Sequence, residues 1–226
     1  MLPQNLVEIK LLIQRLIYSP SGYFAHIDQN TELDLSKDLI GTDLSGINLS
    51  GMNLSAANLS YTNLSGANLS DINLAGANLS YSDLNFANLS FGNFSRANLN
   101  SATIISANLS RANLSFANLC YADLSRANLS RVNLTGTNLT QANLSTANIS
   151  AANLSDTCLI KANLEFANLS DSHLTSADLT LAKLNGIKVI NSRFRDNIGI
   201  SKTSKNTLSL GGAIFEIEEL EDFLEE

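Results

Sequence analysis

The chain has 226 residues, a formal net charge of −7, two Cys, two Pro and no Trp. This length suffices for one domain with a continuous core, and two Cys are too few for a disulfide framework. The charge is uneven, since residues 39–195 carry eight acids and nine bases while residues 196–226 carry eight acids and two bases, which excludes a strongly charged middle segment.

Residues 2–17 are predicted to form an amphipathic helix. Its apolar residues recur at steps of three and four, at Leu2, Leu6, Ile9, Ile13, Leu16 and Ile17. A signal peptide and a membrane span are disfavoured, because three charged residues interrupt the apolar run. Ser19-Pro20-Ser21-Gly22 ends the helix, and we assign residues 1–36 to an N-terminal cap and lead-in.

From Leu39 to Phe194 an apolar residue occupies every fifth position, at thirty-two consecutive positions without interruption. We call this residue the centre of a five-residue unit. The ladder position before it is Asn or Asp in twenty-six units, and the turn position after it is Ser or Thr in twenty-one. The inner position, two before the centre, is most often Ala, and the corner position is two after the centre.

A period of five fits neither a helix nor a flat strand. On a helix, successive centres would step by about 140° and leave no apolar face. On a strand of period two, they would alternate between opposite faces. If the inner position and the centre both point inward, however, inward spacings alternate between two and three residues, so the chain bends at every unit and winds around its own core.

The number of units in each turn is indicated by a second, weaker period. Tyr61, Tyr81 and Tyr121 all occupy corner positions and lie at multiples of twenty residues from one another. This favours four units per coil.

The recurring Ala-Asn-Leu-Ser-x resembles the A(D/N)LXX signature of the pentapeptide repeat family, over residues 37–195. The resemblance implies an all-β fold, a right-handed quadrilateral parallel β-helix of about eight coils, here with short α-helical caps at both ends. The Asn-Leu-Ser style resembles cyanobacterial members. Lys183, Lys188 and Arg193 depart from the Asn/Asp pattern, so we expect the last coil to be the least regular.

After Phe194 the period ends, and residues 196–226 are predicted to contain a loop and an acidic helix. Residues 196–206 are polar, and residues 213–226 place Ile214, Ile217, Leu220 and Leu224 on one side of a helix. We interpret this helix as a cap over the open end of the stack. The alternative is a docking element for a basic partner.

No catalytic group, metal site or cofactor site is evident. His173 occupies a ladder position and has no second His to pair with. Asp43, Asp83, Asp123 and Asp178 stand at ladder positions in place of Asn. Cys120 and Cys158 are expected to be free thiols, because four units per coil would place them nearly two coils apart. We therefore predict a protein that is not an enzyme and binds no cofactor or metal.

Bulky residues at corner positions form the candidate interaction surface, because the repeat favours small residues such as Gly there. Aromatic residues and Arg are the types that anchor protein interfaces. The alternative is that their stacking only stabilises the coils. The set is Tyr61, Tyr81, Phe86, Phe91, Arg96, Arg111, Phe116, Tyr121, Arg126 and Arg131.

Two functions follow. The first is a scaffold that presents a rigid β-helical surface to an unknown protein partner, in the cytoplasm. It would not bind nucleic acid directly or contact a membrane. A monomer is expected, with a dimer through an end helix as the alternative.

The second function is implied by the family, some of whose members resemble B-form DNA and modulate DNA gyrase or another type II topoisomerase. The neutral middle segment disfavours it, because a DNA mimic needs dense negative charge.

Overall fold

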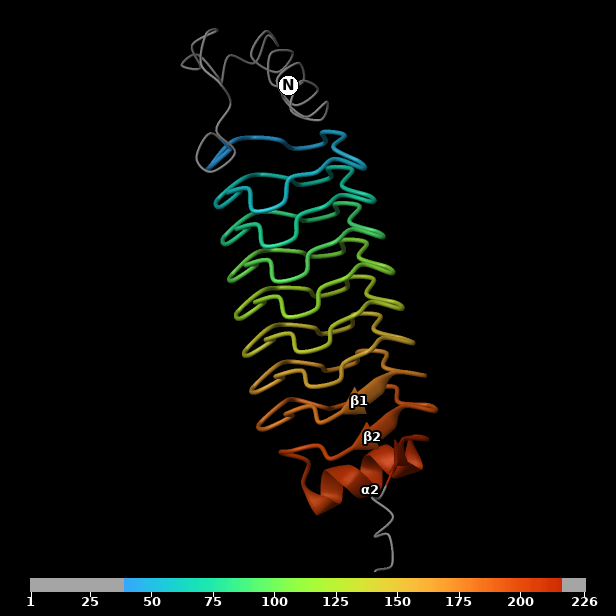
Figure 1. Cartoon of the computed structure of the whole chain (residues 1–226). Coiled ribbons are helices and arrows are strands. Elements are labelled where there is room, and N and C mark those ends of the chain that lie inside the picture. Colours follow the sequence, from blue (N-terminus) through green and yellow to red (C-terminus); the bar gives the residue numbers. More distant parts are fainter. Residues whose placement is uncertain (1–38, 217–226) are drawn as a thin grey trace, which may run out of the picture.

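The computed structural model describes residues 39–216, most of which form a rod of stacked coils (Figure 1). Parallel β-bridges join ladder positions twenty residues apart, from Asp43 with Asn63 to Asp178 with Ile198. Each coil therefore contains four five-residue units, and the thirty-two units make eight coils, as predicted. The expected N-terminal helix at 2–17 and its lead-in lie outside the described residues.

The positions of each unit differ in burial as the pattern predicts. In the middle of the rod the centre Leu114 and the inner Ala112 are buried, whereas the corner Arg111 is exposed. Centres and inner positions from all four sides form one continuous core along the rod. Because each coil covers the next, an inner coil buries its apolar side chains only through its neighbours.

Every backbone N–H of a middle unit has a partner. Asn128 N donates to the preceding coil (2.9 Å), while Leu129 N and Arg131 N donate to the following coil (2.7 and 2.8 Å). Ala127 N closes a turn onto the centre of the preceding unit (3.1 Å). Ser130 N donates to Oδ1 of Asn128 (3.1 Å). The rod thus satisfies its backbone without long strands.

Asn at the ladder position links coils through its side chain. Oδ1 of Asn128 accepts from the side-chain amide of Asn148 (3.4 Å), and Nδ2 of Asn128 donates to Oδ1 of Asn108 (3.2 Å). Asn can do both because its amide is donor and acceptor at once. An ionised Asp only accepts, so Asp123 receives a bond from Asn143 (3.1 Å) but donates none. This asymmetry explains why the repeat favours Asn.

Hydroxyls replace Ala at a few inner positions without leaving a buried group unpaired. Thr62, Thr137 and Thr157 are buried, and each donates to the carbonyl oxygen of a centre residue in the coil before it, at 2.8, 2.7 and 3.0 Å. These bonds offset the desolvation of the hydroxyl groups.

The C-terminal end differs from the prediction. Residues expected to form a loop contain helix α2, Lys202–Leu210, and residues at the start of the expected acidic helix form strand β3, Ile214–Phe215. Ser201 caps α2, since its side chain accepts from Ser204 N, and Gly211 ends the helix. The acidic residues from 217 onward lie outside the described residues.

Strand β3 continues the parallel stack instead of starting a helix. It pairs with β2, Arg193–Arg195, which pairs with β1, His173–Thr175, in the order β1-β2-β3. The Phe215 ring stacks on Phe194 with centroids 5.0 Å apart. Edge pairing and this stacking outweigh the helical spacing of the apolar residues, which is why the predicted helix start was wrong. Helix α2 lies at the end of the rod and buries Leu208 (Figure 1).

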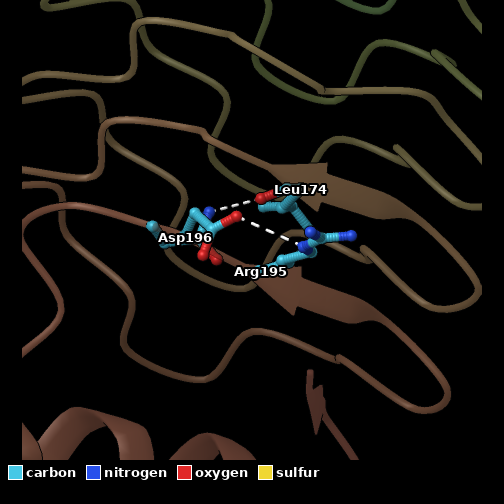
Figure 2. Close-up of polar contacts among 4 residues, drawn as sticks. Leu174, Arg195 and Asp196 are labelled. Atoms are coloured by element: carbon cyan, nitrogen blue, oxygen red, sulfur yellow. Dashed lines mark hydrogen bonds and ion pairs between the residues drawn. The ribbon is translucent and has the colours of Figure 1, made fainter. Parts of the chain in front are cut away.

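The repeat ends where Asn197 occupies the inner position and Gly199 the centre position. The side chain of Asn197, at the inner position, donates to the carbonyl oxygen of Leu174, beside the ion pair of Arg195 and Asp196 at 3.2 Å (Figure 2). Gly199 occupies the next centre, where a Cβ would lie 2.3 Å from the backbone of Thr180. No larger residue fits there, and the chain enters α2 at Lys202.

Candidate interaction surface

The corner positions are set by a tight turn between consecutive sides of the rod. The inner residue's N–H bonds to the preceding centre's carbonyl oxygen, and every corner from 41 to 196 has a positive φ. A positive φ at the third residue is the requirement of a type II turn, which Gly meets without strain. A non-Gly corner costs about 1–3 kcal/mol of backbone strain. Bulky residues at corners are therefore unfavourable for the local backbone conformation, which Gly would adopt without strain.

The structure places all ten predicted surface residues at corners, with positive φ and exposed side chains. Phe86 is 71% exposed and Phe91 is 52% exposed. These aromatic rings are outside the core in the part of the chain that the structure describes, and solvent reaches much of their apolar surface.

The ten residues divide among four columns that run along the rod. Residues twenty apart share a column because one coil has twenty residues. The first column holds the Tyr residues, the second Phe86 and Arg126, the third Phe91, Arg111 and Arg131, and the fourth Arg96 and Phe116. The set surrounds the middle of the rod and does not form one compact patch.

Contacts within columns are short and link neighbouring coils. Tyr61 and Tyr81 stack with centroids 5.0 Å apart and planes 5° apart. The Arg111 guanidinium lies 5.4 Å from the centroid of the Phe91 ring. The Tyr121 hydroxyl accepts from the side-chain amide of Gln141 at 3.0 Å. The structure thus joins several of the predicted residues pairwise along the rod.

Rings also lie over glycine corners of the following coil. A Cβ at Gly136 would be 2.6 Å from the Phe116 ring, and one at Gly186 would be 2.6 Å from the Phe166 ring. Phe166, 66% exposed, belongs to the same class of residue but was not among the ten. Its corner position in the repeat was the signal that identifies it.

The charges separate onto different sides of the rod. We call the side between the second and third columns the Arg side, because its corners include Arg111, Arg126 and Arg131. The preceding side, which we call the Asp side, carries three acids at ladder positions, Asp43, Asp83 and Asp123. A rod of nearly zero net charge therefore has a basic side next to an acidic one.

Within residues 39–216 no group of three or more His, Cys, Asp or Glu could hold a metal ion. His173 is exposed in β1, pairing with Arg193 of β2 and bridging Asn153 on its other side. It serves as a ladder residue, as the sequence predicted. None of the described helices is long and apolar enough to cross a membrane.

Cys120 and Cys158 are free thiols, as predicted. The Thr140 hydroxyl, in the coil between them, lies 3.2 Å from Sγ of Cys158. Burial raises the pKa of the Cys120 thiol, and the nearby Cys158 raises it further. A raised pKa keeps Cys120 protonated at neutral pH, so it is a poor nucleophile.

A cleft of about 580 Å³ opens between α2 and the last coil. Leu184, Ala182 and Leu208 form its apolar part, while Lys183 and hydroxyls of α2 add polar groups. The half-buried Leu184 shows that α2 covers this end of the core incompletely. The lining contains no acid–base pair or activated nucleophile.

Comparison with family models identifies the repeats. The matching family is described as pentapeptide repeats, with eight copies, over residues 38–71, 67–104, 107–145, 127–165, 147–186 and 158–196. Comparison with curated protein sequences gives no match.

Solved structures of other repeat proteins are similar to this chain. HetL, a pentapeptide repeat protein involved in heterocyst differentiation regulation from the cyanobacterium Nostoc sp. strain PCC 7120, is 30% identical over 70% of this chain and 83% of HetL, with a TM-score of 0.38. A trypsin-treated form of QnrB1, a plasmid-mediated fluoroquinolone resistance protein, is 19% identical over 81% of this chain and 94% of QnrB1, with a TM-score of 0.52. Rfr23 from the cyanobacterium Cyanothece 51142 is 24% identical over 70% and 88%, with a TM-score of 0.27. The family and the QnrB1 fold imply a right-handed β-helix.

Proposed function

This chain belongs to the pentapeptide repeat family, and on that premise we propose that it is a non-enzymatic scaffold whose bulky corner side chains bind a protein partner. The rod is a rigid frame. Residues at the inner and centre positions form its core, and those at the ladder and turn positions take part in its hydrogen bonds. Corner side chains remain available for contact.

The observation that carries this proposal is the combination of positive φ and bulk at the same corners. Phe86 has a φ of +60° and Arg131 a φ of +59°, and both side chains are exposed. Gly would adopt this backbone without strain, as it does at Gly66 with a φ of +65°. Aromatic and Arg side chains at strained, exposed positions are best explained by a contact outside the chain.

The test is capture of binding proteins with a matched control. One variant carries Gly at Tyr81, Phe86, Arg111 and Arg131, so that each substitution also relieves backbone strain. The control carries Gly at Thr146, Lys161, Ser176 and Leu181, which are also corners of positive φ. We expect the first variant to lose a protein that the wild type and the control both retain. Equal retention by both variants would contradict the proposal.

The alternative function is that of a DNA mimic that modulates gyrase. QnrB1 is a fluoroquinolone resistance protein of similar fold. However, residues 39–216 carry ten acids and eleven bases, whereas a duplex carries about one negative charge per 1.7 Å. We expect no change in supercoiling by gyrase at stoichiometric protein. Inhibition or protection there would favour the mimic.

We also propose a cytoplasmic location and a monomeric state. Two free thiols suit a reducing cytoplasm. Helix α2 and β3 blunt the strand edge at the C-terminal end, which disfavours end-to-end pairing and supports a monomer. Sedimentation of the full chain at several concentrations tests this assignment.

A further inference from the structure

We propose that the Arg side binds an acidic segment of another protein. This inference rests on the proposed function and deepens it by naming the surface and the chemistry of the partner. The recognising groups are Arg111, Arg126 and Arg131, with Phe86 and Phe91 as apolar neighbours.

The geometry brings the three guanidinium groups to one side of the rod. Arg126 and Arg131 are successive corners of one coil, and Arg111 occupies the corner one coil before Arg131. Coils that pair as parallel strands lie about 4.8 Å apart. The Arg111 guanidinium also lies on the Phe91 ring, 5.4 Å from its centroid, which holds it near the surface while leaving its N–H edge available.

The Arg side contains no carboxylate near these groups. Between corners 86 and 151 its ladder positions are Asn, its turn positions are Ser, and its corners carry no acid. The third column has Asp71 one coil before Phe91 and Asp171 two coils after Arg131. In the described part of the chain, ion pairs join Arg193 with Glu216 and Arg195 with Asp196, and the three Arg residues have no carboxylate partner there. Carboxylates are the groups that guanidinium binds in bidentate fashion.

Charge complementarity favours an acidic protein segment over nucleic acid. Nucleic-acid surfaces are typically extended, in domains of high pI, whereas this chain has a pI of about 4.8. Asp83 and Asp123 lie on the adjoining side and would repel a phosphate backbone that extended past the Arg side. A short protein segment can place a few carboxylates on the three Arg residues and an apolar side chain against the exposed Phe86.

The test measures binding of a short fluorescent peptide of Glu and Phe residues to the full chain by anisotropy at low salt. Arg111→Gln with Arg131→Gln removes two charges from the Arg side. The matched control, Lys161→Gln with Lys202→Gln, removes two charges from residues outside the Arg side and outside the ten residues of the candidate surface. We expect the first variant to bind at least about tenfold more weakly, the scale of an interface anchor, and the control to bind within about twofold of wild type. Equal unfolding midpoints of the three proteins would show that the fold is retained.

Three results would overturn the inference: no binding by the wild type, equal weakening in the control, or tighter binding of a single-stranded oligonucleotide than of the peptide. These results differ from failure of the proposed function. In one case the four-Gly variant loses a captured protein in the first assay, but the acidic peptide does not bind the wild type in the second. The scaffold function then stands, and the partner is bound by a surface other than the Arg side. If both variants in the capture assay retain every protein, the scaffold role itself fails.

Discussion

The middle of the rod and its C-terminal end use the same five-residue unit but stabilise it differently. In the middle, Leu114 is fully buried, and Asn113 donates through its side chain to Asn93. At the end, Leu184 is half-buried and Lys183 occupies the ladder position, where it cannot accept a bond. A five-residue unit is therefore fully stabilised only when a coil covers it on both sides. At the C-terminal end of the rod, α2 and β3 take the place of the next coil.

The largest expected difference between the two regions is in core truncation. Leu114→Ala should lower the free energy of unfolding by about 2–5 kcal/mol, because the covering coils cannot collapse into the cavity. Leu184→Ala should cost less than about 2 kcal/mol, since this side chain already contacts solvent in the cleft. Urea titrations of both variants measure the difference. Equal losses would contradict the dependence of each coil on its neighbours.

A smaller difference is expected at the ladder. Asn128→Ala should cost about 1–3 kcal/mol, because it leaves Ser130 N–H without its acceptor and removes two inter-coil amide bonds. Asn128→Asp keeps the acceptor and should cost less. Lys188→Ala, at the exposed end of the ladder, should change stability by under about 0.5 kcal/mol. Thermal unfolding compares the three, and an Asp variant as unstable as the Ala variant would show that the acceptor does not matter.

A third comparison isolates backbone strain at the corners. Gly66 has a φ of +65° with no atom within 4 Å of an added Cβ, so Gly66→Ala should cost about 1 kcal/mol through the backbone alone. Ala56, with a φ of +58°, is the converse case, and Ala56→Gly should be neutral or stabilising. Chemical denaturation gives both values. If both substitutions changed the free energy of unfolding with the same sign and size, backbone strain would not explain the residue preference at the corners.

Much of the rod could be predicted because its pattern is repeated many times. The unbroken centres determine which side chains face inward, and the spacing of Tyr61, Tyr81 and Tyr121 indicated the coil of four units. The cap could not be predicted in the same way, because α2 has a mostly polar sequence with Leu208 as its buried residue. The helical spacing around Ile214 was outweighed by pairing with β2, a contact that depends on the finished stack.

The candidate surface was predictable by position but not by arrangement. The register alone identifies Phe86 and Arg131 as corner residues, and it could also have included Phe166. Their separation into columns, and the division between the Arg side and the Asp side, depend on how the coil closes. The residues are distant in sequence and become neighbours only through the twenty-residue offset.

On the proposed function, the bulky corner residues contact a partner and do not stabilise the stack. The most direct measurement is urea unfolding of a variant in which all ten residues of the candidate surface are replaced by Gly. Loss of the Tyr61–Tyr81 stack and the Arg111–Phe91 contact should cost about 0.5–1.5 kcal/mol each. Gly adopts a positive φ without strain, so removal of the backbone strain at ten corners, about 1 kcal/mol each, should offset the loss of these contacts. We predict an unfolding midpoint equal to or above that of the wild type, with unchanged circular dichroism. A clearly lower midpoint would show that these side chains stabilise the rod, which would contradict the proposed role in partner contact.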